Sequence, residues 1–575
     1  MSFNQYYKSE LAFIHELARG FAEANPATAS LLKERGSDPD VERLIEAFAF
    51  QAAGIRARMD SVLPSIVHGL ADLLLPHYLR PLPAATIVEF APNLRALRAR
   101  HTVPAGRMLT TKPIDGTACR FRTCFDVDLL PFEVADARLD DAVAARPVLR
   151  LTLRLTEAGK SALPECGRVR FFLHHIEPTL PATLMLWLTR HLTGVSISGT
   201  PGGAPVQLDK TAVEPVGLSR NLAVYPWPDT APSGFRLMFE YFLLPMRFHF
   251  FDLIGLDRVR TSGTEITVNF EFERPPALPT SVRRETVRLY CTPALNLFET
   301  TAEPVTYSPL EREHLLRADG INPRHMEVYE VRSVVGVSRG TSARRNFLPF
   351  FRFSHANASG SPFFSLRQSP AIDGGTDTYL VLDEARGAPP PAHEETISVD
   401  MLCTNRSLAR GLQPGTVTET TPGSMFRAYE NITPVNTPVR VPLGSDALWR
   451  LLSHLALGHR GLRDLESLRG MLRLYDVQAL NGMEDGRIGE RQIEAIRSVE
   501  REMVTRMVLG VPVRAIRTRL ELDETGFASV GNAFLFSALI SELSGSLTEL
   551  NSASEVVATL SASKMEFRWP VQIGV

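Results

Sequence analysis

Apolar residues in the first 80 positions repeat with the three- and four-residue spacing of helices. A first helix is predicted to end at Asn25-Pro26, and its apolar face holds Tyr7, Leu11, Ile14, Leu17 and Phe21. Asp38 can cap a second helix with Pro39 in its first turn, and that helix carries Val41, Leu44, Ile45, Phe48, Ala52, Ile55 and Met59 on one stripe. A third short helix is predicted from about 65 to 75, just before Pro76.

From about Thr86 to Val439 the pattern changes to strands. Residues 86–90 are rich in β-forming types, and both Val148–Leu155 and Glu265–Phe272 alternate between apolar and polar side chains. A helix is predicted to interrupt the strands at 180–191. Clusters of proline and glycine separate the strands, which is typical of loops.

The last part of the chain mixes both periodicities. One predicted helix carries Leu448, Leu451, Leu452 and Leu455, and a second carries Leu465, Leu468 and Leu472. Residues 514–522 alternate and are predicted to form an edge strand, and residues 534–547 are predicted to be helical. We therefore expect an α+β multidomain protein with a helical assembly segment at 1–83, β-rich domains at 84–275 and 276–440, and a mixed α+β domain at 441–575.

Composition narrows the class of protein. The 575 residues hold 62 Lys and Arg against 64 Asp and Glu, a net charge of −2. Such a balance argues against a nucleic-acid binder or a polybasic membrane binder. A stand-alone nucleic-acid module remains an alternative that salt-dependent retention on DNA would reveal.

Cysteine usage and the chain's start suggest the compartment. The five cysteines are odd in number and scattered, which is typical of reduced thiols in the cytosol. The start shows no basic region followed by an apolar core, and no apolar run is long enough to span a membrane. We therefore expect a soluble cytoplasmic protein.

Two stretches partly match enzyme motifs. Gly336-Val337-Ser338-Arg339-Gly340 matches the G-x-S-x-G nucleophile elbow, but the residues that follow carry no apolar stripe for the required helix. Ser338 thus marks an alternative, a cytosolic serine hydrolase, which reaction with a fluorophosphonate probe would test. Gly159-Lys160-Ser161 resembles the end of a P-loop, yet Arg154 stands where the loop needs glycine. No catalytic, cofactor-binding or metal-binding residue is predicted.

Several distinctive stretches follow one another along nearly the whole chain: Tyr6-Tyr7-x-x-Glu10-Leu11, Asp38–Leu44, Phe48–Phe50, Pro76–Pro83, Cys291–Phe298, Tyr329–Val334, Leu402–Arg406 and Leu448–Leu455. In sequence and in order they resemble the type VI secretion baseplate family TssF, also called VasA or ImpG. Gly458 departs from the family, which usually has asparagine there, and the C-terminus is altered.

The resemblance implies a structural role without a cofactor. Two copies would pair with one TssG in a baseplate wedge, six wedges would surround the spike, and TssK and TssE would join the wedge. The platform would contact the spike protein VgrG and the tail tube Hcp, in the cytoplasm at the inner-membrane-docked apparatus, with membrane contact only through the membrane complex. A wedge protein of another contractile phage-tail-like machine is the nearest alternative.

The N-terminal stripes then have two interpretations. They form a subdomain packed on the chain's own β core, or a bundle completed by helices of TssG. The candidate interface residues are Tyr7, Leu11, Ile14, Leu17, Phe21, Leu44, Ile45, Phe48, Ile55 and Met59. We expect Cys403-Thr404-Asn405-Arg406 to tie a strand end to neighbouring backbone; a nucleophilic Cys403 is the sharper alternative, although nothing nearby in the sequence supplies a base.

Overall fold

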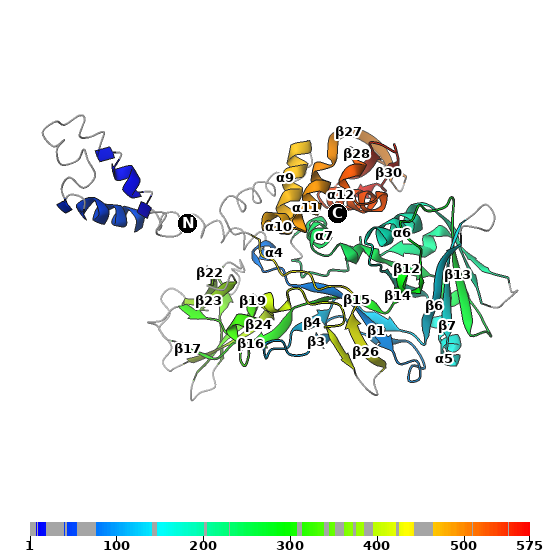
Figure 1. Ribbon diagram of the computed structural model, residues 1–575, viewed down its shortest axis with the longest axis horizontal. Coiled ribbons are helices and arrows are strands. Elements are labelled where there is room, and N and C mark those ends of the chain that lie inside the picture. The colour runs from blue at the N-terminus through cyan, green and yellow to red at the C-terminus, as the bar shows by residue number, and fades with distance from the viewer. Residues whose placement is uncertain are drawn as a thin grey trace. The chain divides into compact units, whose positions relative to one another are not determined.

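The computed structural model divides into two units (Figure 1). One contains the described residues before position 75, and the other contains those from position 76 onward. The described residues are 7–8, 10–15, 17–18, 39–40, 43–54, 76–140, 147–199, 204–228, 231–307, 313–338, 344–350, 362–371, 375–383, 395–420, 425–441, 464–508, 510–549 and 551–574.

The described residues of the first unit are helical, at 7–8, 10–15, 17–18, 39–40 and 43–54. These positions fall within the first two predicted helices. The predicted helices at 65–75 and around Leu448–Leu455 lie outside the described residues.

A six-stranded sheet at the centre of the second unit joins distant parts of the chain. Strand β1 (Ala85–Pro92) follows the short helix α4 (Pro76–Leu79) and pairs antiparallel with β15 (Cys291–Leu295) on one side and β26 (Phe426–Asn431) on the other. The order is β25-β26-β1-β15-β4-β3, with β25 at Thr418–Thr420, β4 at Arg120–Thr123 and β3 at Met108–Thr110. Strands β2 (His101–Val103) and β5 (Val127–Leu129) form a separate ribbon.

Two further sheets share a core beside it. In the first, β7 (Val148–Leu155) pairs with β13 (Glu265–Phe272), and buried Leu151 lies opposite Val268, so the alternation predicted for both segments is confirmed. The other strands are β6 (Phe132–Asp140), β9 (Leu192–Ser198) and β10 (Val206–Leu208). The second sheet, of order β11-β12-β8-β14, contains β11 (Val213–Pro215), β12 (Phe250–Ile254), β8 (Arg168–Leu173) and β14 (Val287–Leu289); helix α5 spans Glu157–Ala162.

Residues 298–404 build two smaller sheets around their own core. Strand β24 (Glu395–Thr404) pairs along its length with β19 (Glu327–Ser338), and alternate residues Ile397, Val399 and Met401 enter the core. The remaining strands are β16 (Phe298–Thr301), β17 (Val305–Thr306), β18 (Glu313–Leu315), β20 (Arg344–Asn346), β21 (Leu348–Pro349), β22 (Phe363–Pro370) and β23 (Thr376–Asp383).

The C-terminal part combines helices with a sheet. Its helices are α9 (Leu465–Tyr475), α10 (Val477–Leu480), α11 (Gly486–Glu494) and α12 (Val530–Ser546), and its strands are β27 (Ile496–Val508), β28 (Val511–Leu522), β29 (Ala553–Leu560), β30 (Glu566–Arg568) and β31 (Gln572–Ile573). The prediction of an edge strand at 514–522 was wrong. Strand β28 lies between β27 and β29, and the parallel partner β29 comes from a segment that local pattern does not reveal.

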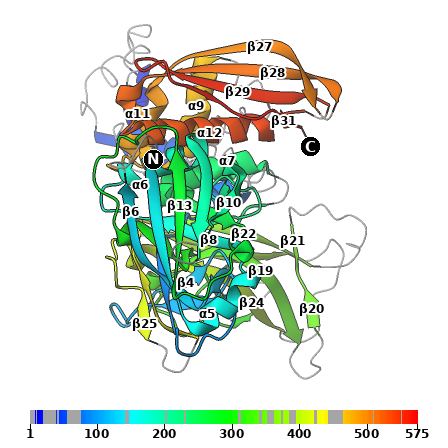
Figure 2. The ribbon, with the colours of Figure 1, turned by 90° about the vertical axis from the view of Figure 1, so that its right-hand side faces the viewer.

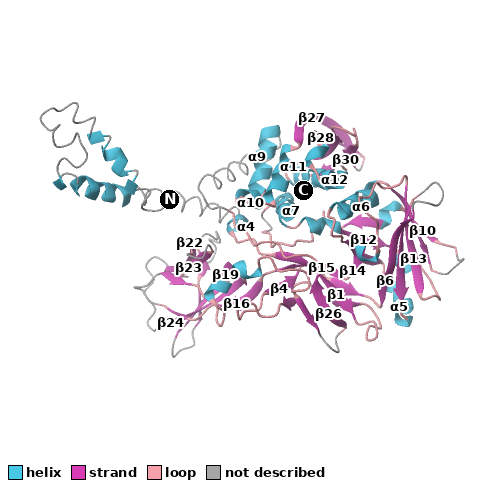
Figure 3. Ribbon diagram, viewed as in Figure 1, coloured by secondary structure: helices cyan, strands magenta, loops and turns pink. Residues whose placement is uncertain are grey.

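Helix α12 packs against α6 (Thr179–Arg190), α7 (Ser233–Leu243) and β29. Figures 2 and 3 show these helices between the C-terminal sheet and the other sheets of the unit. Two glycines permit the close approach: a Cβ on Gly531 would lie 2.4 Å from the backbone of Ala182, and one on Gly234 would lie 2.8 Å from Cα of Leu543. The helices predicted at 180–191, around Leu465–Leu472 and at 534–547 are confirmed as α6, α9 and α12.

The expectation of an α+β multidomain protein is confirmed at that level. The six-stranded sheet takes β1 from the predicted range 84–275 and β15 from 276–440. The finer four-part division stays a prediction.

Candidate partner-binding surface

Small side chains face inward on the second N-terminal helix. Ala49 and Ala53 are fully buried and lie four residues apart, so they share one helix face. Glu10 on the first helix is also buried. The interior of this unit, over its described residues, therefore takes small side chains from residues 43–54 in place of the large ones in the predicted stripe.

Large apolar side chains of the same helices face solvent. Phe48 is 76% exposed and Leu44 is 69% exposed, and Phe13, Leu17 and Phe50 are each more than half exposed. The rings of Tyr7 and Phe50 meet edge to face with centroids 6.5 Å apart. These exposed apolar side chains remain available to a second protein chain, which is the property that a shared helical bundle requires.

The ten candidate interface residues are distributed as follows. Leu17, Leu44 and Phe48 are exposed; Tyr7, Leu11, Ile14 and Ile45 are half-buried; Phe21, Ile55 and Met59 lie outside the described residues. Sequence reasoning missed Phe13 and Phe50 as interface candidates, because neither falls on the apolar stripes. Their size alone, on otherwise polar helix faces, was the available signal.

Ser338 lies at the end of β19, not at a nucleophile elbow. The chain returns as β20, which pairs antiparallel with β19, whereas an elbow continues into a helix. The Ser338 hydroxyl donates a hydrogen bond to Glu395, 3.2 Å away, and the same carboxylate pairs with Arg345 at 2.8 Å. These contacts give Ser338 a structural role at the end of a hairpin.

Burial protects the thiols from ionising. It raises the pKa of Cys403 to about 12, so this side chain remains a thiol at neutral pH. Burial likewise raises the pKa of Cys119 to about 11 and that of Cys166 to about 12. Among the described residues, no group of three or more histidine, cysteine or acidic side chains is placed to hold a metal ion.

The motifs that carry the family resemblance meet in space. Asn405, in the Leu402–Arg406 stretch, accepts a hydrogen bond from the backbone of Arg120 at 2.8 Å and one from Asn296 at 2.8 Å. Thr404 accepts a hydrogen bond from the backbone N–H of Arg406 at 3.1 Å. The expectation that this stretch ties a strand end to neighbouring backbone therefore agrees with the contacts.

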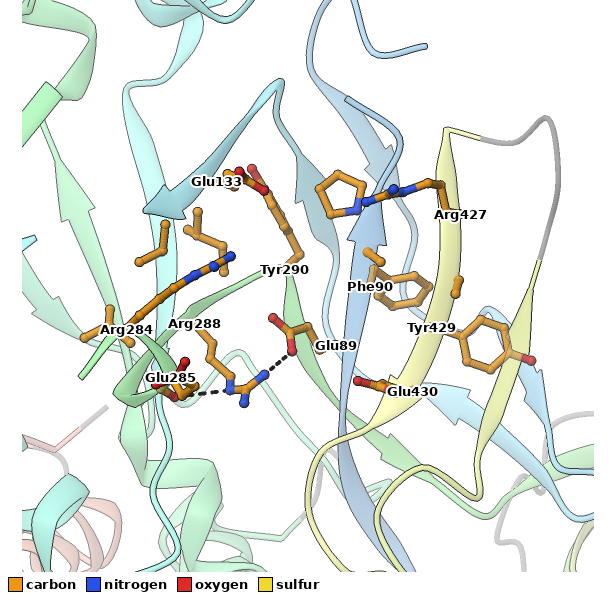
Figure 4. Close-up of a pocket in the computed structure, with 16 residues that line it drawn as sticks. Glu89, Phe90, Glu133, Arg284, Glu285, Arg288, Tyr290, Arg427, Tyr429 and Glu430 are labelled. Carbon is orange, nitrogen blue, oxygen red and sulfur yellow. Dashed lines mark hydrogen bonds and ion pairs between the residues drawn. The ribbon is translucent and has the colours of Figure 1, made fainter. Parts of the chain in front are cut away.

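A charged cleft of about 430 Å³ opens beside β1, β14 and β26 (Figure 4). Arg288 pairs there with Glu89, whose pKa is raised by burial although Arg288 opposes the shift. Arg284, Arg427, Glu133, Glu285 and Glu430 also line the cleft. Acids and bases are mixed along its walls, so the cleft favours no single charge of ligand.

Comparison with known proteins identifies the family. The model of "Type VI secretion system, TssF" matches residues 1–575. The chain belongs to the TssF family. It is 28% identical over 622 residues to the type VI secretion system component TssF1 of Pseudomonas aeruginosa, covering 99% of this chain and 98% of that protein.

Solved structures agree with this assignment. A chain of the TssK-TssF-TssG baseplate subcomplex, determined by cryo-electron microscopy, matches with a TM-score of 0.77 and 27% identity over 93% of this chain and 99% of its own length. A chain of the type VI secretion baseplate complex matches over both full lengths with a TM-score of 0.64 and 23% identity, which shows the fold. This TssF-family chain is thus a baseplate component. No helix in its described part is long and apolar enough to cross a bilayer.

Proposed function

We propose that this chain is a wedge subunit of the baseplate, and that two copies of it hold one TssG through a shared N-terminal helical bundle. The observation that carries the proposal is the match, over 99% of the relative's length, to a chain of a complex that also contains TssG and TssK. Obligate interfaces of this kind bury on the order of 2,000 Å² or more and are apolar. The described N-terminal helices expose large apolar side chains that could enter such an interface.

The exposed side chains give the contact its chemistry. Leu44 and Phe48 are four residues apart and both point to solvent, so together they form one apolar ridge on the second helix. Leu17 is a further exposed apolar side chain, on the first helix. In the bundle this ridge packs against TssG helices, while Ala49 and Ala53, on another face of the same helix, pack inside the N-terminal unit.

Around this core we place the other partners. TssK binds the wedge, TssE joins it on the sheath side, and six wedges surround the spike protein VgrG at the base of the Hcp tube. The assembly lies in the cytoplasm against the membrane-docked apparatus. TssK is supported by the composition of the matched subcomplex, and the remaining partners follow from the family resemblance.

Co-expression with TssG tests the bundle. Native mass spectrometry of the purified complex should give two copies of this chain and one TssG. The double variant Leu44→Glu/Phe48→Glu should lose TssG, because two carboxylates cannot be buried in an apolar interface without a large desolvation cost. Circular dichroism should show that the β-rich unit stays folded.

The matched control is Ile176→Glu. Ile176 is 96% exposed but lies in a loop of the second unit, so its variant should retain TssG. A double variant that still co-purifies with TssG at the original stoichiometry would refute the proposed bundle.

A further inference from the structure

The hairpin of β27 and β28 runs beyond the helix that covers its sheet. The two strands pair from Ile496 opposite Leu522 to Val508 opposite Val511, whereas β29 pairs with β28 only from Ala515 onward. Figure 2 shows the hairpin end extending past the end of α12.

A hydrogen bond locates the end of the covered region. The hydroxyls of Ser544, in the last turn of α12, and Ser554 on β29 are 2.5 Å apart, and Ser554 pairs with Ile516. Side chains directly opposite each other in a ladder share a face of the sheet. Helix α12 therefore covers the Ile516 side of the sheet and ends at that level.

The uncovered continuation of this side combines four apolar side chains with a threonine and an arginine. It holds six side chains, which we call the hairpin face: Met503, Thr505, Met507, Pro512, Arg514 and Ile516. Met503 lies opposite Ile516 and is 75% exposed, and Met507 lies opposite Pro512 and is 68% exposed. Met503 and Met507 lie on the same face of β27 with Thr505 between them, and exposing two large apolar side chains on one face is costly unless something covers them.

The two faces of the hairpin differ in how their charges are satisfied. On the opposite face, Glu502 pairs with Arg517 at 2.8 Å and Arg519 at 3.0 Å, and Glu555 pairs with Arg506 and Arg517. Arg514 on the hairpin face is exposed and forms no ion pair with any residue that the structure describes. Its guanidinium is therefore available to a carboxylate from another chain.

We propose that the hairpin face binds an amphipathic helix of a partner protein, with its apolar stripe on Met503, Met507 and Ile516 and an acidic side chain on Arg514. The same side of the sheet already packs a helix, α12, further along. Methionine is unbranched and polarisable, so it adapts to the surface of an incoming helix. The unpaired arginine beside it supplies complementary charge and fixes the register of the helix.

This surface belongs to the second unit and shares no residue with the N-terminal ridge. It predicts a second contact made by this chain, independent of the helices proposed to hold TssG.

Photocrosslinking in the assembled complex tests the proposal. Benzoylphenylalanine replaces Met507 in the full-length chain, expressed in cells that carry the secretion system, and the complex is isolated through an affinity tag on this chain. The matched control carries the crosslinker at Val511, which is 59% exposed and lies on the opposite face of the same hairpin. We expect at least tenfold more adduct at Met507, joined to a helical segment that carries Asp or Glu.

Charge reversal then tests the role of Arg514. Arg514→Glu should lower the adduct at least tenfold, Arg514→Lys should retain most of it, and Arg at the captured acidic position should restore it with Arg514→Glu. TssG retention in each sample reports on the N-terminal ridge, so a failure of the proposed function is seen separately. Equal adducts at both positions, an adduct to an extended segment or to a second copy of this chain, or insensitivity to Arg514→Glu would overturn the proposal.

Discussion

Asn296 and Asn405 hold each other by two hydrogen bonds although 109 positions separate them. Nδ2 of Asn296 donates to Oδ1 of Asn405 at 2.8 Å, and the backbone N–H of Asn405 donates to Oδ1 of Asn296 at 2.7 Å. Nδ2 of Asn296 also donates to the carbonyl of Arg120 at 2.8 Å. Both asparagines are almost fully buried. The pair joins the end of β24 to β4 and β15 of the central sheet.

Asn405→Ala should therefore be strongly destabilising. It leaves the backbone N–H of Arg120 and one of the two N–H groups of the Asn296 side chain without an acceptor, and each unsatisfied buried group costs about 1–3 kcal/mol. We expect the free energy of unfolding to fall by about 2–4 kcal/mol in urea titrations followed by fluorescence. Asn322→Ala is the control, since Asn322 is an exposed cap that accepts from Arg324, and it should change stability far less. Equal effects of the two variants would contradict this account.

Glu240→Gln should strongly lower the stability of the fold, because it leaves the buried arginines beside it without a carboxylate partner. Glu240 is fully buried, pairs with the fully buried Arg247, and accepts hydrogen bonds from the backbones of Val224 and Tyr225. Arg236 lies 3.6 Å from the same carboxylate.

Removing that charge while both arginines stay buried costs about 3–5 kcal/mol. Thermal unfolding should show a large drop in midpoint. The surface pair of Glu157 and Lys160 gives the control, because Glu157→Gln should leave the midpoint unchanged. An unfolding midpoint of Glu240→Gln within error of the parent would instead show that water solvates the two arginines.

His77→Phe should reduce the loss of stability that occurs as the pH falls below 6.5. Burial, helped by Arg80, lowers the pKa of His77 to about 3, and neither ring nitrogen has a hydrogen-bond partner among the described residues. The unfolded chain takes up a proton near pH 6.5 and the native state does not, so stability is full above pH 6.5 and falls below it.

The slope contributed by one such histidine is about 1.4 kcal/mol per pH unit between pH 6 and 4. In His77→Phe that slope should disappear, while stability at pH 8 is kept because the ring still packs on Trp227. His249, whose pKa burial lowers to about 3, continues to titrate in the variant and serves as the internal reference. An unchanged slope would mean that His77 is protonated in the native state.

Asp476 should give the pH dependence of stability the opposite sign, which Asp476→Asn tests. Burial raises the pKa of Asp476 to about 6, against 3.8 in the unfolded chain. The native state therefore binds the proton more tightly, and stability is lost as the pH rises from about 4 to about 6, by up to about 3 kcal/mol. Asparagine keeps the Oδ1 acceptor that caps the N–H of Ala479, so the variant should be more stable at pH 8 and equal at pH 4. Asp485→Asn, on an exposed residue, should show no such difference.

Strands with one buried face were predictable from the sequence. Leu149, Leu151 and Leu153 alternate with polar residues because one side of β7 meets the core and the other meets solvent. The same pattern in β28 predicted a strand but misplaced it at an edge. Its neighbours β27 and β29 decide that position, and β27 carries so many charged side chains that no strand was predicted at 496–508.

The candidate surface was predictable only in part. Helical spacing identified Leu44 and Phe48 as large apolar residues on one stripe, but not whether that stripe faces inward. The answer depends on Ala49 and Ala53, which fill the interior and leave the larger side chains outside. The hairpin face could not be predicted from the sequence. Only the register of the two strands places Met503 opposite Ile516 and Met507 opposite Pro512.

The position of α12 has a consequence for synthesis of the chain. Nearly every residue of α7 is buried, and its neighbour α12 begins only at Val530. At ~5–20 residues per second, α7 leaves the ribosome tens of seconds before the helix that covers it. The nascent chain must be kept from aggregating during that interval, and a product truncated before Val530 would present the same bare helices permanently. Quality control in the producing cell thus depends on residues that follow Val530.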